Sequence, residues 1–321
     1  MIKLIYPKFW QSRNLIAYLL WPLSLLYSFA GYIRRLTADP IKIPAKVICV
    51  GNISIGGTGK TQIVILLAQL LSKMNINFII ITKGYGSKLK SALLVKDYHN
   101  ASDVGDESVL LLQYGRVIAT KKIQYILPFL AEIKPSVIIV DDAMQNPNLH
   151  KDFVIMSVDD DRLFGNGFLI PAGPLRQYPK FAQNNIDATI LVGSSNASKN
   201  LSLFNKKNLF YAQIAPSNNL DKTKNYFAFS GIGNPGRFFN TLENYGLKLS
   251  GTKIYPDHHQ YVKEDLEYLK NKAKEYSATL ITTRKDYVKI HDEEQSIVIC
   301  DVQLVMTKYQ QFLELINEKI L

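Results

Sequence analysis

The segment with the clearest chemistry is a glycine-rich stretch, SIGGTGKT, at residues 54–61. An apolar run precedes it and a run with leucines at helical spacing follows it, which is the strand–turn–helix order of a phosphate-binding P-loop. Glycines leave backbone N–H groups free to surround an anion, and the helix N-terminus adds partial positive charge. The segment therefore predicts a nucleoside triphosphate site. The alternative is an ordinary glycine-rich turn with a solvated lysine.

Individual residues of this loop are expected to have different roles in binding the nucleotide. Lys60 is expected to reach the β- and γ-phosphates, and the Thr61 hydroxyl to hold Mg²⁺. Ser54 stands where the pattern G-x-x-x-x-G-K-[ST] has glycine, but serine also fits a turn. The residues predicted to bind ATP are Ser54, Ile55, Gly56, Gly57, Thr58, Gly59, Lys60 and Thr61.

Two adjacent acids follow a second apolar run, Val137–Val140. P-loop proteins place a carboxylate at the end of a buried strand beside Mg²⁺, and ligands gather at the carboxyl ends of parallel strands. Asp141 and Asp142 are therefore predicted to handle the metal or to position a reacting group. The alternative is a pair of solvated acids that begin a loop.

Two further residues have the types needed to move a proton. A hydroxyl group is a weak nucleophile at neutral pH, so a positioned base would assist its attack on phosphorus. Asp106, in the segment GDES, and His258, in YPDHHQY, could form such a pair. From the residues alone the alternatives stay open: Asp106 as a helix cap, and His258 and His259 as surface histidines on a loop.

The segment SGIGNPGRFF contains a G-x-G-x-x-G pattern, formed by Gly231, Gly233 and Gly236. This pattern suggests a dinucleotide site, but no acid at a strand end follows about twenty residues later, as that site requires. A strand-to-helix turn of a second domain is the favoured interpretation, with Arg237 placed to contact a substrate phosphate.

The pattern after Pro40 indicates the scaffold for these residues. Short apolar runs alternate with longer amphipathic ones, which is typical of a mostly parallel sheet covered by helices. Runs rich in β-branched residues and without alternation indicate strands buried on both faces. The expected strands are 47–50, 78–82, 137–140, 154–158, 189–192, one near 226, 279–283 and 297–300, and the clearest expected helix is 61–74.

The fold class predicted is α/β: a P-loop-type α/β/α sandwich with a mostly parallel sheet, plus a second smaller α/β domain and an N-terminal hydrophobic helical segment. The expected divisions are a membrane-associated segment at 1–40, the P-loop domain at 41–212 and the second domain at 213–321. A polar stretch, 194–208, is expected to form a loop or linker.

The segment 15–33 is apolar and uncharged, and its length is near the lower limit for crossing a bilayer. It contains tyrosine and tryptophan, which favour the headgroup boundary. Pro22 would kink or break a helix at its middle. Three interpretations stay open: a pair of helices lying in the membrane interface, a single span, or a helix buried in the protein.

Composition limits the partners. The 321-residue chain has a net charge of +11, which favours anionic partners such as nucleotide phosphates or anionic lipid. Its basic residues are scattered rather than interleaved with aromatic residues, so nucleic acid is not expected as a partner. Cys49 and Cys300 lie in apolar runs, as buried thiols of a reducing compartment do, and no Cys or His spacing indicates a metal site.

Eight segments together give the chain a resemblance to the tetraacyldisaccharide 4'-kinase (lipid A 4'-kinase) family. The similarity covers nearly the whole length, and the order of the segments is specific although each one is short. The segments are VGNISIGGTGKT, KGYGS, GDES, VDDAMQ, LIPAGPLRQ, SGIGNPGRFF, YPDHHQY and TTRKD.

The resemblance implies a two-domain kinase at the cytoplasmic face of the bacterial inner membrane. Residues 41–212 are then expected to form a P-loop kinase domain. The implied reaction is ATP-dependent phosphorylation of the 4'-hydroxyl of the tetraacyldisaccharide 1-phosphate precursor of lipid A. Implied cofactors are ATP and Mg²⁺. The expected partners are this lipid and an anionic membrane surface, and the expected oligomeric state is a monomer.

The resemblance also implies residue roles. Asp106 matches the family's general base, and His258 matches the histidine that pairs with it. VDDAMQ matches the family's LDDGFQ, which carries Mg²⁺-handling and catalytic roles onto its two acids and onto Gln145. The predicted catalytic residues are Asp106, His258, Lys60 and Asp142, and the predicted metal residues are Thr61, Asp141, Asp142 and Gln145.

The chain departs from the family pattern in four places. Ala143 and Met144 replace Gly and Phe, whereas Gln177 and Arg284 stand where the family usually has Glu, so no carboxylate role is assigned to the last two. The alternative function is a membrane-associated ATPase switch of the MinD/ParA type, which shares GGTGKT. That class has a lysine directly before the two glycines, where this chain has Ile55, and its membrane helix is usually C-terminal.

Overall fold

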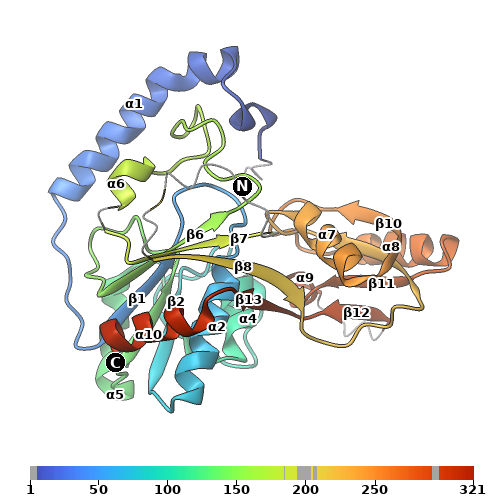
Figure 1. Cartoon of the computed structure of the whole chain (residues 1–321). Coiled ribbons are helices and arrows are strands. Elements are labelled where there is room, and N and C mark those ends of the chain that lie inside the picture. Colours follow the sequence, from blue (N-terminus) through green and yellow to red (C-terminus); the bar gives the residue numbers. More distant parts are fainter. Residues whose placement is uncertain (1–5, 184, 194–203, 205–207, 291–295) are drawn as a thin grey trace.

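A large β-sheet forms the centre of the protein (Figure 1). The computed structural model describes residues 6–183, 185–193, 204, 208–290 and 296–321. Within these residues the strands of the large sheet are β1 (Lys46–Gly51), β2 (Phe78–Thr82), β3 (Leu93–Leu94), β4 (Val117–Ala119), β5 (Val137–Asp141), β6 (Phe153–Asp159), β7 (Ala188–Val192), β8 (Leu209–Pro216) and β13 (Val302–Met306). They lie in the order β13-β8-β7-β6-β1-β5-β2-β4-β3. Neighbours are parallel except in the edge pairs β13–β8 and β4–β3.

A smaller, fully parallel sheet follows, in the order β10-β9-β11-β12. Its strands are β9 (Asn225–Ser230), β10 (Lys248–Ile254), β11 (Thr279–Thr283) and β12 (Ile297–Cys300). The described helices are η1 (Lys8–Gln11), α1 (Leu15–Leu36), α2 (Lys60–Lys73), α3 (Ala101–Val104), α4 (Asp106–Leu112), η2 (Ile123–Ile126), α5 (Leu127–Ile133), α6 (Pro179–Gln183), α7 (Pro235–Tyr245), α8 (Lys263–Glu275), α9 (Arg284–Tyr287) and α10 (Tyr309–Ile320). The expected fold class, with a mostly parallel sheet and a second smaller α/β unit, is confirmed.

The central strands are buried on both faces, as their continuous apolar sequences predict. In β1, Ile48 and Val50 belong to the core layer that also contains residues of α2 and α10. The alternating residues Val47 and Cys49 belong to the opposite layer, which contains residues of η2 and α5. Because successive side chains of a strand point to opposite faces, one short run supports both layers of the sandwich. All eight expected strands occur, and α2 matches the expected helix to within one residue at each end.

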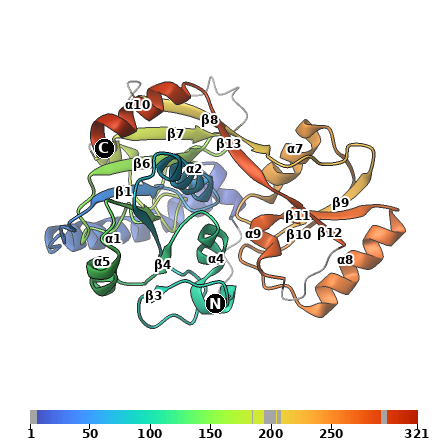
Figure 2. The same cartoon turned by 90° about the horizontal axis from the view of Figure 1, so that it is seen from below.

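The last part of the chain returns to the large sheet. Strand β13 pairs antiparallel with β8, and three residues of α10, Phe312, Ile316 and Ile320, lie in the same core layer as α2. Figure 2 shows β8 and β13 running side by side between the two lobes. The expected second domain, 213–321, therefore differs from the observed sheets, because residues 302–321 complete the larger one. The partner of a short strand is decided by tertiary pairing, which its own sequence does not specify.

The expected polar loop 194–208 lies outside the described residues, apart from positions 204 and 208. Phe204 is buried against Phe164, with their ring centroids 5.4 Å apart.

Helix α1 is a single helix of 22 residues that continues through Pro22, so the expected break is not present. Of its side chains only Ala17 and Ser24 are buried, which shows that the interpretation as a buried helix is wrong. By length and composition α1 is suited to crossing a membrane. Figure 1 shows it at the upper left, set apart from both sheets.

Polar contacts attach α1 and the turn before it to the loop that follows β6. The Ser24 hydroxyl donates to the Leu169 carbonyl at 2.8 Å, and the indole N–H of Trp10 donates to the Pro171 carbonyl at 2.9 Å. Asn14 caps the helix by accepting from the Ala17 N–H. The N-terminal segment is therefore fixed to the large domain while most of its apolar surface faces outward.

Replacing Cys49 by Ser is expected to lower stability without changing catalysis. Cys49 is fully buried in β1, and burial raises the pKa of its thiol to about 12, so the thiol stays protonated and unreactive. A hydroxyl placed in this apolar layer costs about 1–3 kcal/mol. Thermal unfolding should show a lower Tm, with kcat unchanged well below it. A loss of kcat in a variant of unchanged Tm would contradict this.

Candidate active site

The glycine-rich loop joins β1 to α2 in the way the sequence predicts. Gly59 caps α2 with φ +88°, and a Cβ there would come within 2.9 Å of a methyl group of Val192, so this position requires glycine. Asn52 holds the loop from inside, since its amide donates to the Ser54 carbonyl at 2.7 Å and to the Thr58 hydroxyl at 3.2 Å. The tight turn is thus prepared before any ligand binds.

The loop's backbone N–H groups are available to an anion. Within the described residues, no hydrogen-bond acceptor occupies the N–H groups of residues 56–59. They adjoin the N-terminus of α2, whose first residue is Lys60. Free N–H groups beside a helix N-terminus form the cradle that a triphosphate requires.

Asp142 collects the positive charges around this cradle. Arg176 binds both of its carboxylate oxygens, at 2.9 and 3.1 Å, and Lys60 and Lys83 lie 3.7 and 3.6 Å from it. Burial raises the pKa of Asp142, but the positive charges of Lys60, Arg176 and Lys83 more than offset this and bring the pKa down to about 2. Asp142 is therefore a charged group that gathers three cations beside the glycine-rich loop.

Asp141 is in a different state from its neighbour. It is 3% exposed, and neither of its carboxylate oxygens has a hydrogen-bond partner among the described residues. Burial, together with the charges of Glu107 and Asp142, raises its pKa to about 8, although Lys60 acts in the opposite direction. A buried carboxylate whose oxygens accept no hydrogen bond, beside the lysine of the glycine-rich loop, has the chemistry of a cation ligand.

The other predicted metal residues lie at the same edge. Thr61 is the second residue of α2, and the Gln145 amide donates to the Asn52 carbonyl at 2.6 Å, at the start of the loop. No cluster of three or more His, Cys, Asp or Glu suited to a metal occurs in the described part of the chain.

Asp106 and His258 meet although 152 residues separate them. The His258 Nδ1 lies 2.9 Å from Asp106 Oδ2. Asp106 is the first residue of α4 and is 4% exposed, and His258 comes from the loop after β10, with φ +58°. His259 instead contacts Asp265 at 2.7 Å. Of the alternatives left open, the surface-histidine interpretation is therefore wrong for His258.

Charge around Asp106 keeps it ionised. Burial raises its pKa, but Lys285 and His258 more than offset this and hold the pKa well below the usual range for aspartate. Lys285 Nζ lies 3.9 Å from Asp106 and 3.1 Å from Glu107. A carboxylate that is charged, buried and hydrogen-bonded to an imidazole can accept a proton from a substrate hydroxyl.

The second domain touches the glycine-rich loop through the segment SGIGNPGRFF. A Cβ on Gly233 would come within 2.7 Å of the Gly57 nitrogen, so the two backbones are in close contact. Asn234 donates to Asp159 at 3.2 Å, and Arg162 donates to the Gly233 carbonyl at 3.3 Å. This segment is a strand-to-helix turn, from β9 into α7, as favoured from the sequence.

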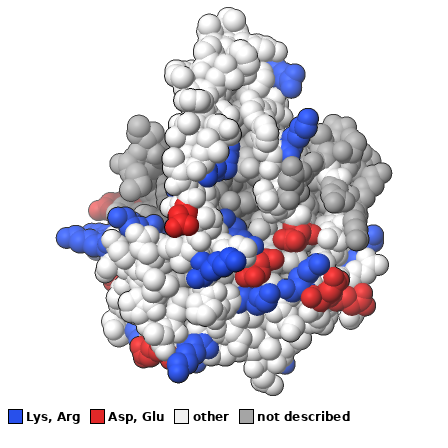
Figure 3. All heavy atoms as spheres, turned by 90° about the vertical axis from the view of Figure 1, so that its left-hand side faces the viewer, with Lys and Arg blue, Asp and Glu red and all other residues white. Residues whose placement is uncertain are grey.

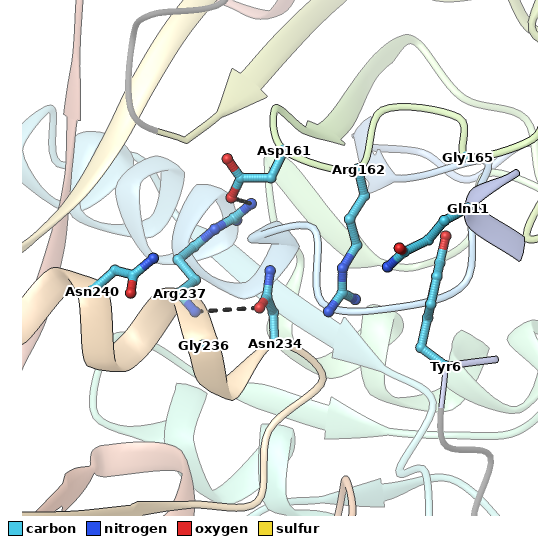
Figure 4. Close-up of a pocket in the computed structure, with 9 residues that line it drawn as sticks. All are labelled: Tyr6, Gln11, Asp161, Arg162, Gly165, Asn234, Gly236, Arg237 and Asn240. Atoms are coloured by element: carbon cyan, nitrogen blue, oxygen red, sulfur yellow. Dashed lines mark hydrogen bonds and ion pairs between the residues drawn. The ribbon is translucent and has the colours of Figure 1, made fainter. Parts of the chain in front are cut away.

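A cavity of about 420 Å³ lies beside this contact (Figure 4). Arg162 extends into it between Asn234 and Tyr6, and its guanidinium lies 4.6 Å from the centre of the Tyr6 ring. Arg237 forms an ion pair with Asp159 at 2.5 Å. The cavity thus joins the N-terminal segment, the large domain and the second domain beside the nucleotide loop.

Three cationic residues near the acids had no role assigned from the sequence: Lys83, Arg176 and Lys285. Each lies in a segment that carried the family resemblance, KGYGS, LIPAGPLRQ or TTRKD. Those segments were the available signal, but their spacing does not show that the three side chains converge on Asp142 and Asp106.

Comparison with known proteins shows which family the chain resembles. Residues 16–321 match the family model described as tetraacyldisaccharide-1-P 4'-kinase. Tetraacyldisaccharide 4'-kinase of Rickettsia canadensis is 61% identical over 323 residues, covering 100% of this chain and 98% of the relative. The enzyme of Rickettsia conorii is 59% identical over 321 residues, covering 100% and 99%. A crystal structure of "apo" form LpxK from Aquifex aeolicus in complex with ATP superposes with a TM-score of 0.75 at 26% identity, covering 96% of this chain and 100% of that one.

These matches confirm the resemblance carried by the eight segments. The match extends from α1 through α10, so it includes the glycine-rich loop, Asp106, the pair Asp141 and Asp142, and the second domain. The chain belongs to the tetraacyldisaccharide-1-P 4'-kinase family.

Proposed function

We propose that this protein transfers the γ-phosphoryl group of ATP to the 4'-hydroxyl of a tetraacyldisaccharide 1-phosphate, the lipid A precursor. The observation that carries the proposal is the Asp106–His258 contact, 2.9 Å long, at the junction of two domains that also meet at the glycine-rich loop. An ionised base beside a phosphate-binding loop suits transfer to an alcohol. An ATPase switch of the MinD/ParA type has no need of such a base directed at an acceptor.

In the proposed reaction the acceptor oxygen attacks the γ-phosphorus. Asp106 accepts the hydroxyl proton, the new O–P bond forms, and the bond between the γ-phosphorus and the bridging oxygen breaks to release ADP. His258 orients the carboxylate and shares the charge change. Lys60 and the free N–H groups of the loop offset the negative charge of the transferring group.

Mg²⁺ is the expected second cofactor, and the residues present fit it. Asp141 offers two buried oxygens without hydrogen bonds among the described residues, and Thr61 stands at the position whose hydroxyl holds the metal in P-loop proteins. Bound Mg²⁺ would supply charge neutralisation at the β- and γ-phosphates. Asp142 would support the metal site by holding Lys60, Lys83 and Arg176 in place. Gln145 would support it through its hydrogen bond to the start of the glycine-rich loop.

The proposed location is the cytoplasmic face of the inner membrane, where ATP and the acylated acceptor are both accessible. Large apolar side chains are exposed along α1, and Arg34 and Arg35 follow in its last turn. Figure 3 shows a mostly uncharged upper region on this side, above a region with many Lys and Arg. This arrangement suits an apolar helix in lipid with basic groups near anionic headgroups. The proposed working unit is a monomer, with no nucleic-acid partner.

Charging the outer surface of α1 is expected to weaken membrane binding. Leu19 and Leu26 are 70% and 66% exposed, so Leu19→Asp/Leu26→Asp removes apolar contacts with lipid and leaves the packed core intact. Sedimentation with phosphatidylethanolamine–phosphatidylglycerol vesicles should show a loss of binding of at least about tenfold. Tyr98→Asp, on a loop residue that is 81% exposed, is the matched control and should bind as the wild type does. Equal binding by all three proteins would exclude α1 as the membrane contact.

The reaction itself is testable with purified protein. Radiolabelled ATP, Mg²⁺ and detergent-dispersed tetraacyldisaccharide 1-phosphate should yield a bisphosphorylated lipid, separable by thin-layer chromatography. Omission of the lipid should leave ATP hydrolysis far slower than transfer. Folded protein that binds ATP but forms no labelled lipid would remove the assignment, and lipid-independent hydrolysis at the full rate would favour the switch.

A further inference from the structure

The segment TTRKD, residues 282–286, has no part in the reaction as described so far. It ends β11 and begins the short helix α9, which Thr283 caps by accepting from the Asp286 N–H at 3.0 Å. Its three charged side chains contact three different places. Arg284 pairs with Asp301 inside the second domain, Lys285 reaches the large domain, and Asp286 points into the core beneath the loop that carries His258.

Asp286 is fully buried and is surrounded by donors. Four groups donate to it and Lys289 forms an ion pair with it at 2.8 Å. The donors are the Ser230 hydroxyl at 2.8 Å, the Gly231 N–H at 3.0 Å, the Thr283 hydroxyl at 2.9 Å and the Tyr261 hydroxyl at 3.1 Å. A buried carboxylate with this many partners fixes its own backbone, and therefore fixes α9.

The same anchor holds the backbone of His258. The Gly231 carbonyl accepts from the His258 N–H at 3.1 Å and from Lys289 Nζ at 3.3 Å. Gly231 itself is bound to Asp286 through its N–H. One buried group therefore sets the position of both the histidine and the residue next to Asp286, Lys285.

Lys285 leaves α9 toward α4, which belongs to the other domain. Its Nζ lies 3.1 Å from Glu107 Oε1 and 3.9 Å from Asp106 Oδ2, and its side chain is 20% exposed. It therefore approaches the same oxygen of Asp106, Oδ2, that the imidazole of His258 contacts at 2.9 Å. A cation held there by a rigid anchor attracts the carboxylate and opposes its rotation away from the histidine.

We propose that Lys285 is a positioning residue for phosphoryl transfer: held by the Asp286 anchor, it binds Asp106 and Glu107 across the domain junction so that Asp106 stays charged and directed at His258. This inference rests on the proposed function. It gives the segment TTRKD a role that links docking of the second domain to the readiness of the base.

The other charges facing Asp106 agree with this role. Glu107 follows it on α4, His258 approaches from the loop after β10, and Lys289 adds positive charge from beyond α9. Asp257 contacts the far ring nitrogen of His258 at 3.8 Å. Among these groups Lys285 makes the largest favourable contribution that keeps the pKa of Asp106 low. Without Lys285, burial would raise the pKa of Asp106 with less opposition from nearby positive charge.

The experiment measures transfer kinetics for Lys285→Met, Lys285→Arg and the control Arg284→Met. Arg284 lies on the same helix and forms an ion pair with Asp301, whereas the ion pairs of Lys285 are with Asp106 and Glu107. Lys285→Met should lose about tenfold or more in kcat, with KM for ATP nearly unchanged. The acid limb of its kcat profile should move up by about one pH unit or more, because an adjacent cation lowers a carboxyl pKa by that amount. Lys285→Arg should restore most of both, and Arg284→Met should resemble the wild type.

The outcomes separate the two proposals. If the wild type forms no phosphorylated lipid, the proposed function fails, whatever Lys285 does. If the wild type is active and Lys285→Met keeps the wild-type kcat and acid limb, the positioning role is overturned. A fall in kcat matched by a fall in Tm, with an unmoved acid limb, overturns it too. Should Lys285→Met not fold, Lys285→Gln keeps a polar side chain beside Glu107 and must show the same shift of the acid limb.

Discussion

Asp106→Asn is expected to lower kcat by about 10²–10⁴-fold, the usual contribution of a positioned general base. The amide keeps the size of the side chain and its place in α4, but it cannot take the proton of the acceptor hydroxyl. ATP binding should persist, because the glycine-rich loop and Lys60 are unaltered. Initial rates with the lipid acceptor, together with calorimetric titration of ATP, would check both statements.

A matched control exists in the neighbouring histidine–aspartate contact. His259 and Asp265 lie 2.7 Å apart in the second domain, in the same kind of pair but outside the junction with the nucleotide loop. Asp265→Asn should therefore keep kcat within about twofold even if it lowers Tm, because the contact has no reacting group beside it. Equal losses of kcat in both variants would mean that the histidine loop is structural and that Asp106 is not the base.

Lys60→Ala is expected to reduce kcat by about 10²–10³-fold, the range found when one preorganised donor to a transition state is removed. ATP affinity should also fall, since Lys60 is the cation that the loop offers to the β- and γ-phosphates. The fold should survive, because Asp142 keeps Arg176 and Lys83 as partners. Single-turnover transfer and ATP titration would separate the two effects.

Lys73→Ala provides the comparison for this variant. Lys73 is exposed at the other end of α2, so it removes a lysine from the same helix without touching the nucleotide site. Its kinetics should match the wild type. A Lys60→Ala enzyme with wild-type kcat would show that the triphosphate does not bind in this loop.

Local sequence predicted the parts whose structure depends on neighbours in the chain. The strand β1, the turn at Gly59 and the helix α2 are consecutive, and each has a local cause: apolar β-branched residues, a glycine at positive φ and leucines at helical spacing. The placement of Asp141 and Asp142 at the end of β5 has the same origin, since parallel strands bring their carboxyl ends to one edge.

The distinction between these two acids was not visible in the sequence. Asp142 is surrounded by Lys60, Lys83 and Arg176, which come from three different segments, whereas the carboxylate of Asp141 accepts no hydrogen bond among the described residues. Burial and partners decide whether a carboxylate serves as a charged anchor or as a candidate metal ligand. Both are set by packing between elements distant in the sequence.

The contact between Asp106 and His258 was implied by family resemblance, and nothing in their spacing predicts it. The interpretation of α1 as a buried helix was wrong, because an apolar stretch has the same composition whether protein or another apolar environment covers it. The return of β13 and α10 to the large sheet was missed for a similar reason. A short strand shows its own propensity but not its partner.

The sequence by itself determined the nucleotide loop, the buried parallel strands and the family, because these depend on residue type and on spacing over a few turns or strands. Only the tertiary structure decided which charges meet: His258 and Lys285 on Asp106, and three cations on Asp142. Electrostatic interactions fall off with distance and depend on burial, so they are fixed by packing within the large domain and by how the two domains dock, and not by the order of residues along the chain.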